Sequence, residues 1–128
     1  MGIQYKLRDV GDVTVIDLMG QLTLASMPPY SGETGVVISD IVHDLADRKK
    51  KKLLLNLGDV TYIDSCGIGH IVQAVASARR KNLDIRLANP AAPVFALLRI
   101  THLEKIVDIA ESEAAGIAAF GKTPAKKK

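Results

Sequence analysis

The chain has 128 residues, 48% of them hydrophobic, which is enough for one domain with a single core. Its one cysteine excludes an internal disulfide and a cysteine-cluster zinc site, and no apolar run approaches the roughly 20 residues that span a bilayer. The net charge of +3 depends on lysine runs at 49–52 and 126–128. Because the chain has only two Phe, three Tyr and no Trp, this charge does not indicate nucleic-acid binding.

Charges interrupt the first seventeen residues, so we expect no signal peptide and a cytoplasmic protein.

In chain order, the sequence first predicts a β-hairpin. Alternating polar and apolar residues indicate a strand at 5–10, a tight turn at Gly11 and a second strand at 13–18. Residues 24–35 contain prolines, glycines and hydroxyl residues, which are typical of a loop. A helix should follow, because apolar residues then recur at helical spacing, namely Ile38, Ile41, Val42 and Leu45.

The second half of the chain alternates strands with helices. We expect strands at 53–57, 85–88 and 106–109, and helices at 65–81, after Pro90 and from Ser112. This order is typical of an α/β domain with a mixed sheet of four to five strands. About four helices should pack mainly on one face of that sheet, leaving the other face open or available to a partner. The domain should occupy residues 1–120, and 121–128 should form a basic, disordered tail.

Residues 64–69, Asp-Ser-Cys-Gly-Ile-Gly, carry most of the functional information. Asp64 and Ser65 stand where a helix should begin, and both residue types cap helices because their side-chain oxygens accept bonds from free N–H groups. A phosphate on Ser65 would be well placed at that partly positive helix end. Gly67 and Gly69 each cost about 1 kcal/mol relative to alanine in a helix. Their presence suggests that something approaches this backbone closely.

Each of these residues also has a purely structural interpretation. Ser65 could be a cap and nothing more. Asp64 is better explained as a cap than as an orienting group for a partner's nucleotide. Cys66 is better explained as a small buried filler than as a redox sensor, and Ile68 as a core residue. His70 is five residues from Ser65 on a helix and should point away from it, so we expect no catalytic site. The three histidines show no metal-ligand spacing, and we expect neither a metal nor a cofactor.

Residues 59–69 resemble the phosphorylation-site signature of the STAS domain, specifically that of the bacterial anti-sigma factor antagonists. In that family a strand leads through Asp-Ser-(Ser/Thr)-Gly-(Leu/Ile)-Gly into a helix. Residues 13–22, which end in Gly-Gln-Leu, and residues 87–98, which begin Leu-Ala-Asn-Pro, resemble further elements of the family. The resemblance covers about residues 3–119.

The resemblance implies a phosphorylation-controlled switch in transcription that has no catalytic activity of its own. The unphosphorylated protein would bind an anti-sigma factor that is also a serine kinase, and would thereby release a sigma factor. Phosphorylation of Ser65 would break the complex and a serine phosphatase would restore it, while a homodimer is left open. The alternatives are a STAS subunit of a stress-signalling assembly and an accessory component of a lipid transporter, which neighbouring genes would distinguish.

Two features depart from the family pattern. Thr23 stands where members commonly carry an Asp, in a loop beside the phosphoserine, and 25–35 is longer than the usual connection. Residues 27–30 could form a rigid apolar knob for partner choice, although a variable surface loop is the simpler interpretation. We expect Thr23 and this knob to lie in a polar surface loop on the same edge as Ser65. The expected partner-binding residues are Thr23, Tyr30, Asp64, Ser65, Cys66, Gly67, Ile68 and Gly69.

Overall fold

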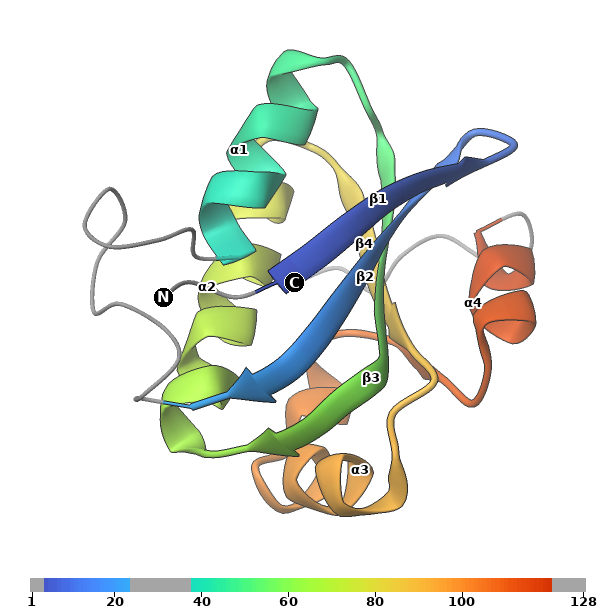
Figure 1. The fold of residues 1–128 in the computed structure, drawn as a ribbon. Coiled ribbons are helices and arrows are strands. Elements are labelled where there is room, and N and C mark those ends of the chain that lie inside the picture. The colour runs from blue at the N-terminus through green and yellow to red at the C-terminus, as the bar shows by residue number, and fades with distance from the viewer. Residues whose placement is uncertain (1–3, 24–37, 121–128) are drawn as a thin grey trace.

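The five strands that the structure describes form one sheet in the order β1-β2-β3-β4-β5 (Figure 1). The structure is a computed structural model that describes residues 4–23 and 38–120. β1 runs antiparallel to β2, and every other neighbouring pair is parallel. The sheet is therefore mixed, as predicted, and its strands are β1 (Gln4–Val10), β2 (Val13–Leu22), β3 (Lys52–Ile63), β4 (Asp84–Ala88) and β5 (Ile109–Ala110).

Helices cover the two faces of this sheet unequally. Within the described residues they are α1 (Ile38–Asp47), α2 (Ser65–Arg80), α3 (Ala92–Ile100), the 3-10 helix η1 (Leu103–Lys105) and α4 (Glu113–Ala119). α1, α2 and α3 contribute to the main core on one face, and only α4 packs against the other face (Figure 1). The prediction of helices mainly on one face is confirmed. None of the described helices is long and apolar enough to cross a membrane.

Alternation along the strands divides the core between the two faces. In β3, Leu53, Leu55 and Leu57 point into the main core, whereas Leu54 belongs to a second, smaller cluster with Phe120. Successive side chains of a strand point to opposite faces of the sheet, and this alternation requires the division. The predicted stripe of α1 is buried at all four positions, which confirms it as the core-facing side of that helix: Ile38, Ile41, Val42 and Leu45.

Three predicted strand boundaries are wrong. β2 extends beyond residue 18 to Leu22, and β3 extends beyond residue 57 to Ile63. Two shifts of register between these strands let pairing continue past Gly58, which reads in the sequence as a break. The strand predicted at 106–109 is reduced to Ile109–Ala110, since only Leu87 and Ala88 of β4 pair with it. The predicted loop 24–35 and tail 121–128 lie outside the described residues.

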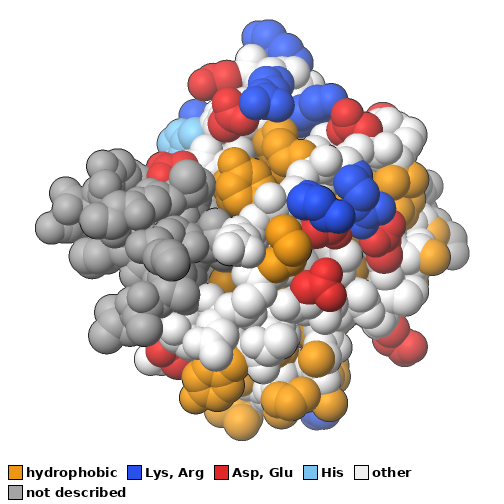
Figure 2. Space-filling view, viewed as in Figure 1, with side chains coloured by type: hydrophobic (Ala, Val, Ile, Leu, Met, Phe, Trp, Pro, Cys, Tyr) orange, Lys and Arg blue, Asp and Glu red, His pale blue; other side chains and the backbone are white. Residues whose placement is uncertain are grey.

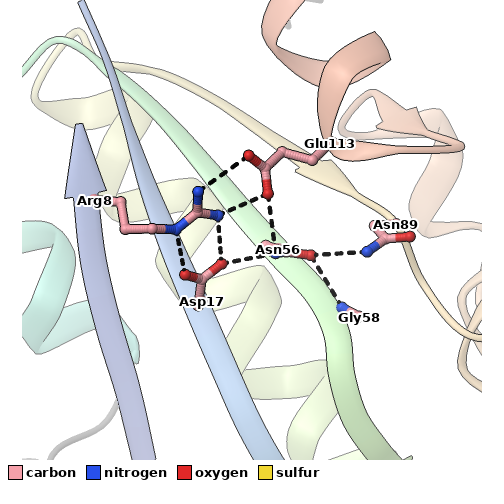
Figure 3. Close-up of polar contacts among 6 residues, drawn as sticks. All are labelled: Arg8, Asp17, Asn56, Gly58, Asn89 and Glu113. Atoms are coloured by element: carbon pink, nitrogen blue, oxygen red, sulfur yellow. Dashed lines mark hydrogen bonds and ion pairs between the residues drawn. The ribbon is translucent and has the colours of Figure 1, made fainter. Parts of the chain in front are cut away.

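A charged cluster, defined as Arg8, Asp17, Asn56 and Glu113, joins α4 to the second face of the sheet (Figure 3). Arg8 Nε lies 2.6 Å from Asp17 Oδ2, and its Nη2 lies 2.7 Å from Glu113 Oε1. Asn56 Nδ2 donates to Asp17 Oδ1 over 2.7 Å. The Arg8 guanidinium, helped by Asn56, holds the pKa of Asp17 below its usual value against the opposing effect of burial. The cluster thus fastens the first two strands to the last helix.

Candidate partner-binding site

The parallel strands β2 and β3 end together, and α2 begins directly after β3. Leu22 is paired with Ile63, and the Asp64 N–H donates to the Leu22 carbonyl over 3.2 Å. The ends of two strands and the start of a helix therefore meet at one place, which we call the Ser65 edge and define as residues 20–23 and 59–72. The carboxyl ends of parallel strands are where α/β folds commonly present their binding residues.

Asp64 caps α2, which confirms the structural interpretation of this residue. Its backbone is extended, its Oδ1 accepts from the Gly67 N–H over 3.1 Å, and its carbonyl accepts the first helical bond, from Ile68. Ser65 is therefore the first residue of the helix and not its cap. Its side chain is exposed and makes no hydrogen bond to any described residue.

The position of Ser65 suits a phosphoryl group. The first N–H groups of a helix lack acceptors within the helix, and the aligned peptide dipoles place partial positive charge at this end. A phosphate carries about −1.5 to −2 charges at neutral pH, so it would be stabilised at the start of α2. The Ser65 side chain is exposed to solvent. A negatively charged group on its hydroxyl would lie at the end of α2 where such a charge is favoured.

The two glycines of the motif differ in their surroundings. A Cβ placed on Gly67 would lie 2.1 Å from the Leu22 carbonyl oxygen and 2.8 Å from Ile63 Cγ1. The close approach expected at this position is therefore made by the protein's own β2 and β3, and Gly67 is buried. Gly69 is exposed, and a Cβ there would meet nothing within 4 Å. Of the two, only Gly69 leaves open space for a partner.

The remaining predicted partner-binding residues are placed as follows. Ile68 is 8% exposed and belongs to the main core, as its structural interpretation predicted. Cys66 is a half-buried free thiol, so it is less enclosed than expected. Thr23 does lie at the Ser65 edge, but it is 8% exposed, and its assignment to a polar surface loop is wrong. It follows Leu22, the last residue of β2, directly. Tyr30 lies outside the described residues.

His70 lies on a different side of α2 from Ser65. It is 7% exposed, whereas Ser65 faces solvent. Burial lowers the pKa of His70, and its Nδ1 has no hydrogen-bond partner in the part of the chain that the structure describes. An imidazole placed in this way does not reach the serine hydroxyl, as a nucleophile and its base must. In residues 4–23 and 38–120, no three His, Cys, Asp or Glu side chains are grouped so that they could hold a metal ion.

Sequence reasoning missed two further features of the Ser65 edge. Tyr62, near the end of β3, is 57% exposed, and Val72 on α2 is 38% exposed. The only charged residues in 18–23 and 57–78 are Asp59 and Asp64. Figure 2 shows apolar side chains gathered at the lower end of the molecule, over α3 and beside the end of β3. The long interval without Lys or Arg is the sequence signal that could have indicated a charge-poor surface.

The motif, the mixed sheet and the placement of the helices agree with a known family. Residues 4–116 match the family model of the STAS domain. An anti-sigma factor antagonist from Mycobacterium paratuberculosis has the same fold, with a TM-score of 0.74 and 13% identity over 91% of this chain and 92% of that chain. The fold is also that of SpoIIAA in its unphosphorylated form, with a TM-score of 0.62 and 17% identity over 94% of this chain and 100% of that chain.

Two more solved structures extend the comparison. The phosphorylated form of SpoIIAA, a Bacillus cell fate determinant, matches with a TM-score of 0.59 and 16% identity over 91% of this chain and 99% of that chain. A sulfate transporter family protein from Wolinella succinogenes matches with a TM-score of 0.62 and 11% identity over 84% of each chain. At these sequence identities, the similarity to the solved structures shows that this chain shares their fold.

Proposed function

Because the chain belongs to the STAS domain family, we propose that it is an anti-sigma factor antagonist whose partner binding is controlled by phosphorylation of Ser65. The observation that supports this best is the exposed hydroxyl of Ser65, which bonds to none of the described residues and lies at the first position of α2, directly after the Asp64 cap. SpoIIAA, which shares the fold, has been solved in both phosphorylated and unphosphorylated forms. The partner would be an anti-sigma factor with serine-kinase activity.

Phosphorylation would act on the interface and would leave the fold intact. In the free protein, the phosphate remains in water and is stabilised by the start of α2. In a complex it would be desolvated beside Asp64, and residues 18–23 and 57–78 contain no Lys or Arg to pair with it. Burying an unpaired dianion costs several kcal/mol, on the order of the whole free energy of a moderate interface. The modified protein would therefore dissociate from its partner.

The resulting cycle has three steps. The unphosphorylated domain holds the anti-sigma factor, so that the sigma factor is free to direct transcription. The kinase activity of the anti-sigma factor modifies Ser65 and ends the complex. A serine phosphatase then removes the phosphate and restores the binding form. The domain itself serves as the substrate and binding partner in a cytoplasmic signalling pathway, and it needs neither a cofactor nor catalysis of its own.

A phosphorylation assay tests this proposal directly. The full chain is incubated with ATP and, one at a time, with each purified anti-sigma factor kinase encoded in the same genome. We expect one of them to label the chain stoichiometrically, with the phosphate mapped to Ser65 by peptide mass spectrometry. The Ser65→Ala variant serves as the matched control and should bind the same kinase without being labelled. Labelling that persists in Ser65→Ala, or no labelling by any kinase, would contradict the proposal.

A further inference from the structure

Tyr62 is exposed to an unusual degree for an aromatic residue in a strand. Its exposed fraction is 57%, compared with 36% for Tyr5 and 37% for Phe95. It is paired with Gln21 directly after the last shift of register between β2 and β3, and it stands three positions before Ser65. An aromatic ring buries a large area when a partner covers it, and tyrosine loses little side-chain entropy when it is held.

The solvent-facing side of α2 is also unusual, because it carries no charge over its first three turns. Its exposed residues recur at helical spacing, and none before Arg80 is charged. They are Ser65, Gly69, Val72, Gln73 and Ala76. The neighbouring helix α1 shows the ordinary pattern, since its exposed side carries His43, Asp44 and Asp47. The exposed side of α2 therefore suits contact with a protein better than contact with water.

We propose that Tyr62 is the anchor residue of the interface at the Ser65 edge, and that the anti-sigma factor receives it in an apolar pocket and not on a basic patch. This inference rests on the proposed function and names the chemistry of the partner surface. Asp59 and Asp64 are the only charges nearby in the sequence, so the receiving surface carries no acidic group opposite them. Tyr62 and Val72 are exposed apolar side chains of the Ser65 edge, and a Cβ on Gly69 would meet nothing within 4 Å, so a partner can approach the backbone of α2 closely there.

The apolar character of the interface also explains how one phosphate can release the partner. Interface anchors are enriched in Tyr, and they are surrounded by contacts that exclude water. A phosphate on Ser65 would lie inside that water-excluding region. A basic pocket would attract the phosphate and tighten the complex, whereas an apolar pocket excludes it. Phosphorylation should therefore weaken partner binding and not strengthen it, because the surface around Ser65 is charge-poor.

Calorimetric titration against the anti-sigma factor kinase that labels Ser65 tests the anchor. Tyr62→Ala should weaken binding by at least about tenfold, which is the usual effect of removing an aromatic anchor. Tyr62→Phe keeps the ring and should bind within about threefold of wild type. Val10→Ala is the matched apolar control, because Val10 is 37% exposed and lies at the hairpin, roughly 30 Å from Ser65 along the strands. Thermal melting of each variant shows that the fold is retained.

Salt dependence tests the apolar pocket separately. Between about 50 mM and about 500 mM salt, the affinity of wild type should change by less than about threefold, because screening acts on charged contacts. Equal binding by wild type and Tyr62→Ala would overturn the anchor while leaving the proposed function in place. An affinity that falls more than about tenfold over that salt range would overturn the apolar pocket. If wild type bound none of the kinases, the proposed function would fail and the anchor with it.

Discussion

The charged cluster and the Ser65 edge belong to the same sheet but use polar groups in opposite ways. In the cluster, the one Arg8 guanidinium is shared between the two carboxylates of Asp17 and Glu113, so each carboxylate contacts a positive charge (Figure 3). At the Ser65 edge the hydroxyl has no partner among the described residues, and its surroundings are nearly uncharged. Figure 2 shows basic and acidic side chains together over the strands, whereas apolar ones gather at the lower end, over α3 and beside the end of β3.

The difference follows from what each region has to do. Asp17 is 6% exposed, and a carboxylate at that depth would be costly unless it were paired and hydrogen-bonded. Arg8 and Asn56 satisfy it, and the link to Glu113 holds α4 on the second face. Ser65 needs no partner, because water satisfies an exposed hydroxyl. Under the proposed function Ser65 would be the modified group, so the fold would be held at one place and regulated at another.

Gly67→Ala should have the largest effect, since it changes the packing on which the Ser65 edge is built. The added Cβ would lie 2.1 Å from a backbone oxygen, which cannot move aside as a flexible side chain can. We expect a loss of about 3 kcal/mol or more in the free energy of unfolding, measured by urea denaturation. A loss below about 1 kcal/mol would show that the end of β2 can shift, and would contradict the rigid junction with α2.

Thr23→Asp should destabilise the protein by about 2 kcal/mol, because it places a charge at a site that is only 8% exposed. Had Thr23 lain in a surface loop, as the sequence suggested, this substitution would have changed the phosphorylation rate more than the stability. Thermal melting and the initial rate of Ser65 labelling, measured on the same samples, separate the two cases. A melting temperature equal to that of wild type, together with a changed rate, would restore the surface-loop interpretation.

Asp17→Asn tests the charged cluster and should lower the free energy of unfolding by about 1–2 kcal/mol at neutral pH. The expected loss is modest because Arg8 is partly exposed, and water screens its interaction with Asp17. The folded state lowers the pKa of Asp17, so the stabilisation is present above the unfolded pKa of about 3.9. It is lost as the pH falls through the lower, folded pKa. The difference in stability between wild type and variant should therefore shrink below a pH of about 4.

Urea denaturation at several pH values measures this difference. Asp12→Asn is the matched control, because the Asp12 side chain is 75% exposed and pairs with Lys52 at the surface. Such a pair contributes little because water screens it, so the urea midpoint of the control should match that of wild type at each pH. A difference between Asp17→Asn and wild type that did not change with pH would mean that the charge of Asp17 contributes nothing to the cluster.

The parts of the molecule that were predictable from the sequence are those set by local chemistry. The buried stripe of α1 follows from helical spacing, and the caps at Asp64 and Ser112 follow from side-chain oxygens that reach N–H groups three residues on. The continuation of β3 past Gly58 was not predictable, because it depends on pairing with β2. At the site, the burial of Thr23 likewise depends on how the end of β2 is covered.

The charged cluster was not predictable either, because it depends on contacts between segments that lie still further apart in the sequence. Arg8 and Glu113 are separated by 105 positions in the sequence, so no periodicity or spacing relates them. Gly67 shows the limit at the site itself. Its presence in the motif indicated a close approach, but only the packed structure shows that Leu22 makes the approach. Sequence reasoning therefore located the Ser65 edge, and the structure separated the residues that build it from those that face outward.

Ser65→Asp should separate the effect on binding from the effect on stability. A helix N-terminus tolerates a negative charge, so the melting temperature should stay within a few degrees of wild type, equivalent to about 1 kcal/mol. Affinity for the anti-sigma factor kinase should fall by at least about tenfold, or about 1.4 kcal/mol. Calorimetric titration and thermal melting measure the two quantities. A variant that unfolds, while its remaining folded fraction still binds at full affinity, would contradict regulation at the interface.

Gly69→Ala is expected to have the smallest effect on the fold, and it has the opposite sign to Gly67→Ala. The added methyl group meets nothing within 4 Å, and alanine is favoured over glycine in a helix, so the free energy of unfolding should rise by about 0.5–1 kcal/mol. The same methyl group would occupy the space through which a partner reaches α2. We therefore expect a more stable protein that binds the anti-sigma factor kinase less tightly. Higher stability with unchanged affinity would show that the partner does not cover Gly69, and would place the interface on the Tyr62 side of Ser65 alone.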